Sequence, residues 1–373
     1  MLTIFSHMSA LAAQHDAINL AQGFPDFPID GKLASFVTKA IQSGANQYAP
    51  MAGLPAFQQA IAGKISRDLG VAVDGAKEVT ITPGATYALY TAAQTILYPK
   101  EECIVLEPAY DSYAPAILAA KAKPVFVPLI SGNFRPDFDR IAAALTPRTK
   151  AIFINTPHNP TGTVWEPEDF RNLADLVQRR GLYVISDEVY DQIVFDGRKH
   201  LSVLQFPELR ERAFVCFSYG KSTHTTGWKI GSCVAPPRLT EDFRKIHQYL
   251  AFSVNTPMQV ALAKYLSPDY FAPPADLLQP RRDLLISLLK DTPFRILEPA
   301  AGTYFQLADY SAISNKPEKE VAEWLTKEYG VATIPVSAFY HDERNQNLLR
   351  FCFAKKEETL RAAAEKLKEV KRG

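Results

Sequence analysis

From about residue 78 onward, short apolar runs alternate with amphipathic stretches, and this rhythm constrains the fold more than any other feature of the chain. Strands that alternate with helical segments are typical of βα units and of a largely parallel sheet. Seven runs have the length and composition of such strands: residues 79–82, 103–107, 124–128, 151–155, 183–187, 214–218 and 230–235. The sequence therefore predicts an α/β fold around one large sheet.

The rhythm changes near residue 268, where prolines 268, 273, 274 and 280 interrupt it. Such a cluster is typical of a domain boundary. We expect a long helix from about Arg281, then strands around 294–297 and 303–308, a helix, a strand near 348–353 and a terminal helix. The chain thus divides into a larger and a smaller part.

Composition excludes several classes of protein. Lys plus Arg is 41 and Asp plus Glu is 40, so the net charge is +1 and predicts no nucleic-acid partner. No apolar run approaches the roughly 18 residues of a membrane span, and the first basic residue, Lys32, comes too late for a targeting leader. The four cysteines form no C-x-x-C pair, which predicts neither a metal site nor disulfides and favours the cytoplasm.

Two nucleotide-binding interpretations fail on spacing. The segment Ser-Tyr-Gly-Lys-Ser at 218–222 looks like a P-loop, but Val215 stands where that motif requires its first glycine. No G-x-G-x-x-G follows a predicted strand either, so the dinucleotide-binding fingerprint is missing.

The stretch from Ser218 to Gly231 places Lys221 in a tight loop just after a strand, with a second cation, Lys229, eight positions later. Alone, Lys221 would be a surface lysine in a turn. The stretch resembles the cofactor-lysine signature of the class I/II aminotransferases, which use pyridoxal 5′-phosphate. Lysine suits this task because its pKa yields readily to its surroundings. The resemblance implies that Lys221 forms a Schiff base with the cofactor and later carries a proton from the substrate's α-carbon.

Two further segments fit the same family. Asn-Thr-Pro-His-Asn-Pro-Thr-Gly at 155–162 resembles its N-P-x-N-P-x-G element, although in isolation it is equally compatible with simple loop chemistry. Asp187 ends a predicted strand, where ligands of open α/β sheets bind. The resemblance implies that Asp187 pairs with the protonated pyridine nitrogen, while Asn159 and Tyr190 bind the ring's 3-oxygen.

A strand-to-helix junction at 83–86 offers backbone N–H groups to an anion. The resemblance assigns the cofactor's phosphate to Gly84, Ala85, Thr86, Ser218 and Lys229, and has Tyr110 stack on its ring. Many members of the family carry arginine where this chain has Lys229.

The remaining candidates concern the substrate and a second subunit. Arg350 lies inside an apolar strand, where a charge needs a partner, and the resemblance supplies the amino acid's α-carboxylate, held together with Asn159. Gly23 and Phe24 resemble the family's opening loop near the substrate. Tyr48 matches the tyrosine that reaches the neighbouring subunit's phosphate, which implies a homodimer with shared active sites. Phe252 is placed at the side-chain pocket, contributed by the partner.

The resemblance implies fold type I, with a large domain over residues 36–268 and a smaller α+β domain from 1–35 and 269–373. The expected activity is ping-pong transfer of an amino group from an L-amino acid to a 2-oxo acid. The sequence around His247 is most similar to the methionine aminotransferase and kynurenine or glutamine transaminase branch. This similarity favours methionine, aromatic amino acids, kynurenine or glutamine as donors.

Two alternatives stay open. The first is a cysteine-conjugate β-lyase on the same scaffold. The second is a non-catalytic ligand sensor, which is disfavoured because no helix-turn-helix precedes Gly23 and because Lys221, Asp187 and Arg350 are all present.

Overall fold

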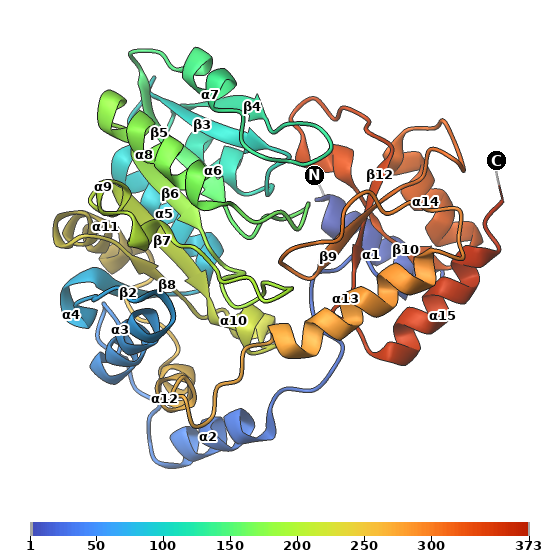
Figure 1. Cartoon of the computed structure of the whole chain (residues 1–373). Helices are drawn as coiled ribbons and strands as arrows, with labels where there is room; N and C mark the ends of the chain where they lie inside the picture. Colours follow the sequence, from blue (N-terminus) through green and yellow to red (C-terminus); the bar gives the residue numbers. More distant parts are fainter. Residues whose placement is uncertain (1–2, 372–373) are drawn as a thin grey trace.

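The computed structural model describes residues 3–371. Its main feature is a seven-stranded sheet in the order β2-β8-β7-β6-β5-β3-β4 (Figure 1). Strand β8 is antiparallel to both of its neighbours, and the other pairs are parallel. The strands are β2 (Val79–Thr82), β3 (Glu102–Glu107), β4 (Lys123–Pro128), β5 (Thr149–Asn155), β6 (Tyr183–Asp187), β7 (Ala213–Ser218) and β8 (Gly231–Val234). The predicted α/β fold is confirmed, and every predicted strand of this sheet lies within two residues of its observed position.

Helices cover both faces of this sheet (Figure 1), which explains why its strands are apolar runs without alternation. In β5, Ile152 and Ile154 enter the core on one face, whereas Ala151 and Phe153 enter the core on the other. The first face carries α2 (Gly31–Gln42), α3 (Pro55–Leu69), α7 (Phe138–Ala144), α8 (Pro167–Arg180), α9 (Pro207–Arg210) and α12 (Thr256–Tyr265). The second carries α5 (Ala85–Ile96), α6 (Tyr113–Ala119) and α11 (Pro237–Leu250), and the short α4 (Gly75–Glu78) and α10 (Tyr219–Ser222) flank β2 and β7.

A second core joins the beginning and the end of the chain. Strand β1 (Ile18–Asn19) pairs in parallel with β10 (Val331–Ala332), and β11 (Ile334–Pro335), β12 (Leu348–Cys352) and β9 (Phe305–Asp309) form an antiparallel sheet. Around them pack α1 (Ile4–Gln14), α13 (Ala275–Leu289), α14 (Glu318–Glu328) and α15 (Glu357–Lys368). Figure 1 shows α1 among these C-terminal elements, apart from α2 and α3. The domain boundaries near residues 36 and 268 stay a prediction.

Two predictions for this region are wrong in detail. Residues 294–297 form no strand, and Arg295 makes only an isolated bridge to Asp309, because prolines 293 and 299 flank the segment and have no N–H to donate. The long helix begins at Ala275 instead of near Arg281, with Pro280 inside it. Buried leucines along α13, including Leu278, compensate for the hydrogen bond that the proline removes.

Within residues 3–371, no helix is long and apolar enough to cross a membrane.

Candidate active site

A cavity of about 290 Å³ lies where β5, β6 and β7 end, between the large sheet and β12. The last residues of β5 and β6, Asn155 and Asp187, are paired in register, so both side chains reach the same edge of the sheet. Eleven of the fifteen predicted site residues line this cavity: Gly23, Ala85, Thr86, Tyr110, Asn159, Asp187, Tyr190, Ser218, Lys221, Lys229 and Arg350. The fold thus brings together residues that are more than 300 positions apart.

Asp187 is buried at the edge of the sheet and held by two donors. The Tyr113 hydroxyl donates to its Oδ2 at 2.7 Å, and the Val189 N–H donates to its Oδ1 at 3.3 Å. Burial raises the pKa of Asp187 to about 6, and the Tyr113 hydrogen bond works against that rise. Its ionised form therefore gains from a cationic partner in the cavity.

Asn155 joins Asp187 to the loop that carries Asn159. Its Nδ2 donates to the Asp187 carbonyl oxygen at 2.8 Å, and its Oδ1 accepts the Asn159 N–H at 2.8 Å. These two bonds fix the positions of Asp187 and Asn159 relative to each other.

Lys221 lies in α10, directly after β7, and its Nζ is 5.8 Å from the centre of the Tyr190 ring and 5.7 Å from that of Tyr304. Burial, together with the positive charges of Lys229 and Arg350, lowers the pKa of Lys221 to about 8. A lysine of this kind loses its proton close to neutral pH, which is what an amine nucleophile or proton acceptor needs.

Arg350 is a buried cation in the middle of β12, only 1% exposed. Its Nη1 donates to Asn159 Oδ1 at 2.7 Å, its Nη2 donates to the Ala21 carbonyl at 2.9 Å, and its guanidinium lies 3.7 Å from the centre of the Phe305 ring. Among residues 3–371 no carboxylate pairs with Arg350, and its Nε has no partner. A buried charge in this state is costly, so the site fits a ligand with a carboxylate.

The start of α5 fits a phosphate group. Gly84, with φ at 84°, turns the chain from β2 into the helix, and Ala85 and Thr86 in the first turn of α5 line the cavity, where a helix N-terminus favours an anion. The Lys229 side chain lies against this turn, since a Cβ atom on Gly84 would be 3.2 Å from Lys229 Nζ. Ser218, at the end of β7, lines the same cavity.

Four predicted site residues do not line the cavity of a single chain: Gly84, Phe24, Tyr48 and Phe252. Gly84 lies beside it against Lys229. Tyr48 is 81% and Phe252 48% exposed, and their rings pack together with centres 5.3 Å apart. Phe24 is 44% exposed, and Lys355 Nζ lies 4.5 Å from the centre of its ring.

Several residues that build the site have no role predicted from the sequence. Phe5 of α1, Gln22, Leu89 and Phe305 line the cavity. For Phe5 and Gln22 a signal existed, because one lies on an apolar helical stripe and the other in the motif that contains Gly23. For Tyr113 and Phe305 the sequence carries no such signal.

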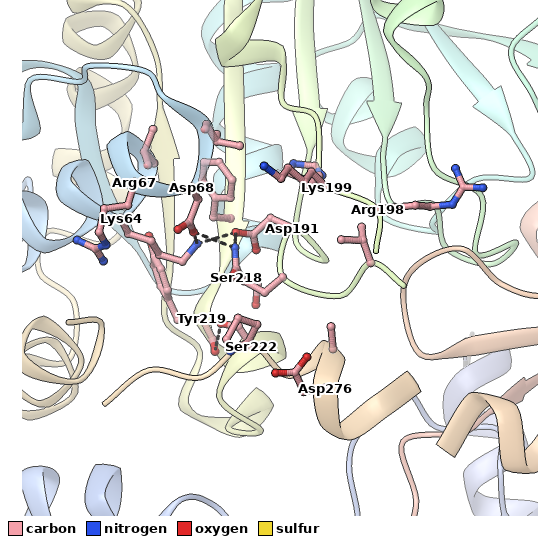
Figure 2. A pocket seen from close by; sticks show the side chains of 18 of the residues that line it. Lys64, Arg67, Asp68, Asp191, Arg198, Lys199, Ser218, Tyr219, Ser222 and Asp276 are labelled. Atoms are coloured by element: carbon pink, nitrogen blue, oxygen red, sulfur yellow. Dashed lines mark hydrogen bonds and ion pairs between the residues drawn. The ribbon is translucent and has the colours of Figure 1, made fainter. Parts of the chain in front are cut away.

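A larger cavity, of about 500 Å³, lies between α3, the loop after β6 and α13, and Ser218, Tyr219 and Ser222 form part of its wall (Figure 2). Lys64 Nζ lies 2.9 Å from both Asp68 Oδ2 and Asp191 Oδ2, as the dashed lines in Figure 2 show. One lysine is thus shared by two carboxylates. The network connects α3 to the loop after β6.

Comparison with known proteins decides the family. Residues 15–367 match the model of the family described as "Aminotransferase class I and II". The methionine aminotransferase of Escherichia coli (strain K12) is 47% identical over 370 residues, which cover 99% of this chain and 96% of the relative. The chain belongs to the class I and II aminotransferases.

Other aminotransferases also match this chain along almost its whole length. A solved E. coli structure with a methionine aminotransferase function superposes with a TM-score of 0.96, at 47% identity over 99% of this chain and 98% of that one. The N-succinyldiaminopimelate aminotransferase of Mycobacterium tuberculosis gives a TM-score of 0.95 at 38% identity, over 99% and 97%. Human kynurenine–oxoglutarate transaminase 1 is 33% identical over 97% of this chain and 94% of its own length.

The predicted family, the fold-type I architecture and the assignment as an aminotransferase are thereby confirmed. The roles of the individual site residues stay predictions.

Proposed function

We propose that this aminotransferase binds pyridoxal 5′-phosphate at Lys221 and moves the amino group of an L-amino acid to a 2-oxo acid by a ping-pong mechanism. One observation carries the proposal: Arg350, buried and without a carboxylate partner among the described residues, shares a cavity with Lys221 and Asp187. A cation for an acid, an amine of lowered pKa and a buried carboxylate are the three groups that this chemistry requires.

The residues present fit the cofactor. Asp187 would face its ring nitrogen, Asn159 and Tyr190 its 3-oxygen, and Tyr110 its ring. Its phosphate would be held by Gly84, Ala85, Thr86, Ser218 and Lys229. When bound, pyridoxal 5′-phosphate supplies an aldehyde that bonds to amines and a ring that withdraws electrons from the substrate's α-carbon.

Lys221 moves the proton. With a pKa of about 8, a useful fraction of its Nζ is unprotonated near neutral pH and accepts the proton from the substrate's α-carbon. Lys229 and Arg350 favour this neutral form by charge repulsion.

Arg350 and Asn159 orient the substrate. The guanidinium is held by Asn159 Oδ1 and by the stack on Phe305, so it presents its remaining donors in a fixed plane to the α-carboxylate. Two parallel hydrogen bonds to a carboxylate fix direction as well as position.

The cavity favours large, uncharged side chains. Phe5, Leu89, Tyr110 and Phe305 give it an apolar and aromatic wall. Thioether sulfur gains about 0.3–1.5 kcal/mol per aromatic contact, and flat rings stack at a similar gain. We therefore expect methionine, aromatic amino acids, kynurenine and glutamine to be better donors than aspartate. The relatives named for methionine and kynurenine support this choice.

We propose that the enzyme is a cytoplasmic homodimer with shared active sites. Tyr48, Tyr249, Leu250 and Phe252 are exposed apolar side chains near one another in the chain or in space, and such patches mark interfaces. Each chain would contribute Tyr48 and Phe252 to its partner's site. The four buried free cysteines are in keeping with a reducing compartment.

A screen of donors and acceptors on the purified protein tests the activity. We expect kcat/KM for methionine and phenylalanine to exceed that for aspartate, and double-reciprocal plots at several acceptor concentrations to be parallel. Preference for aspartate would overturn the substrate class, and intersecting plots would overturn the ping-pong mechanism.

Product analysis separates the proposed activity from the β-lyase alternative, which no observation here favours. An aminotransferase converts the donor to its oxo acid, whereas a lyase releases pyruvate and ammonia from a cysteine conjugate.

A further inference from the structure

His247 occupies the last turn of α11, fully buried, and both of its ring nitrogens have partners. Nε2 lies 3.0 Å from the Met51 carbonyl oxygen, and Nδ1 lies 2.9 Å from the Tyr87 hydroxyl oxygen. Because a carbonyl oxygen only accepts, Nε2 carries the proton and Nδ1 accepts from Tyr87. Burial lowers the pKa of His247, so the ring is neutral at neutral pH and keeps this one arrangement.

The partners of His247 belong to segments with proposed roles in the active site. Met51 is three residues after Tyr48, in the same loop. The His247 carbonyl accepts the N–H groups of Ala251 and Phe252, at 3.1 and 3.2 Å, where Phe252 leaves the helix with φ at 62°. The ring of Phe252 then packs edge-on against Tyr48. A single buried residue is therefore bonded to both segments that carry the exposed aromatic pair.

Nearby bonds hold the same loop to the segment after α11. The Ser253 hydroxyl donates to the Ala49 carbonyl at 2.9 Å, and the Thr256 hydroxyl donates to the Gln47 carbonyl. His247 adds a contact of a different kind, because Tyr87 lies on α5, next to Thr86. Through His247 the loop is bonded to α5 as well as to the segment after α11, in addition to the bond from the Ile81 N–H of β2 to the Ala52 carbonyl at 3.0 Å.

We propose that His247 is a positioning residue that holds Tyr48 and Phe252 in place for the active site of the partner subunit. The inference rests on the proposed homodimer with shared sites. His247 does not line the cavity of its own chain. Its effect is therefore expected in the other subunit, which distinguishes it from a residue that only stabilises its own fold.

Hybrid dimers made from differently tagged chains test this in both directions. In the first hybrid, a chain with an intact site is paired with a Lys221→Ala chain that also carries His247→Leu. In the second, the intact-site chain carries His247→Leu, and its Lys221→Ala partner keeps His247. Only the chain with Lys221 can bond covalently to the cofactor, so borohydride trapping reports on one defined site in each hybrid.

We expect the first hybrid alone to be impaired. The pyridoxal 5′-phosphate concentration for half-maximal trapping should rise about three- to tenfold, the loss that one or two buried neutral hydrogen bonds produce. His247→Gln in the same position should restore most of it, because an amide can donate to Met51 and accept from Tyr87. Impairment of the second hybrid, of both equally, or of neither overturns the proposal.

Two further variants keep the test decisive. If the leucine variant does not assemble, Tyr87→Phe in the same two hybrids removes the donor to Nδ1 and should give the same one-sided pattern, whereas a loss in its own subunit overturns the proposal. Tyr48→Phe placed in the Lys221→Ala chain of the first hybrid, instead of His247→Leu, tests the shared site itself. If it does not change the trapping of the cofactor, the proposed shared active site is wrong, independently of His247.

Discussion

Replacing Arg350 with methionine gives the sharpest test of the substrate-binding geometry. The guanidinium has a fixed plane, two of its donors are used by Asn159 Oδ1 and the Ala21 carbonyl, and no carboxylate among the described residues balances its charge. Hydrogen bonds to charged groups contribute about 1.5–3 kcal/mol each, so two bonds to the substrate's carboxylate amount to about 3–6 kcal/mol. We expect kcat/KM for methionine to fall about a hundredfold to ten-thousandfold in Arg350→Met.

The assay pairs this variant with a substrate that lacks the same group. Methionine is compared with 3-(methylthio)propylamine, which has the same side chain and amine but no carboxylate, on the wild type and on Arg350→Met. The amine should be a poor substrate for both enzymes, and to a similar extent, because the lost interaction is the same one. The four rates form a double-mutant cycle whose coupling energy should be most of the 3–6 kcal/mol estimated above.

The stability of the variant separates binding from folding. The Arg350→Met substitution removes an uncompensated buried charge, which stabilises the fold. It also leaves Asn159 Oδ1 and the Ala21 carbonyl without a donor, which destabilises the fold. We expect the free energy of unfolding of the cofactor-free protein to change by no more than about 3 kcal/mol. If the variant loses the same factor on the amine as on methionine, the coupling is zero and Arg350 does not bind the α-carboxylate.

Three other predictions follow from the same geometry. Borohydride should trap the cofactor on the peptide that contains Lys221, and a label on any other lysine would contradict the assignment. Tyr113→Phe removes a donor that favours ionised Asp187, so the pKa of Asp187 should rise and the acidic limb of kcat/KM should move to higher pH; an unmoved limb would show that this carboxylate does not control the rate. Lys64→Met leaves Asp191, whose side chain is only 10% exposed, without its cation and should lower the free energy of unfolding by about 3–5 kcal/mol in urea, with Asp191→Asn restoring part of it; a loss below about 1 kcal/mol would refute this account of the ion pair beside the second cavity.

Much of the large sheet could be predicted from local patterns. Strands buried on both faces are continuous apolar runs. Helix ends can be predicted where a glycine adopts a left-handed conformation, as Gly181 does directly after α8 with a φ of 66°. The same locality explains why motifs around Lys221, Asp187 and Asn159 were recognisable. Each lies where a strand of a parallel sheet ends, so its position along the chain almost fixes its position in space.

The errors arise where tertiary contacts outweigh local signals. The prolines before Arg281 indicated a later helix start, but α13 includes Pro280 because its leucines pack into the second core. The segment 294–297 has the composition of a strand, yet its neighbours offer it only one bridge. Local propensity determines the secondary structure of such segments only where tertiary packing does not favour one conformation over another.

The sequence alone was enough to predict a seven-stranded α/β fold, the family, and most of the residues that line the cavity. Only the tertiary structure decided that Arg350 donates directly to Asn159 across 191 positions, that Phe5 of the first helix lines the same cavity, and that Tyr113 is a donor to Asp187. The physical reason is the distance along the chain over which the deciding interactions act. Secondary structure and strand-end motifs depend on neighbours in the chain, whereas burial, charge compensation and lowered or raised pKa values depend on which distant segments the cores bring into contact.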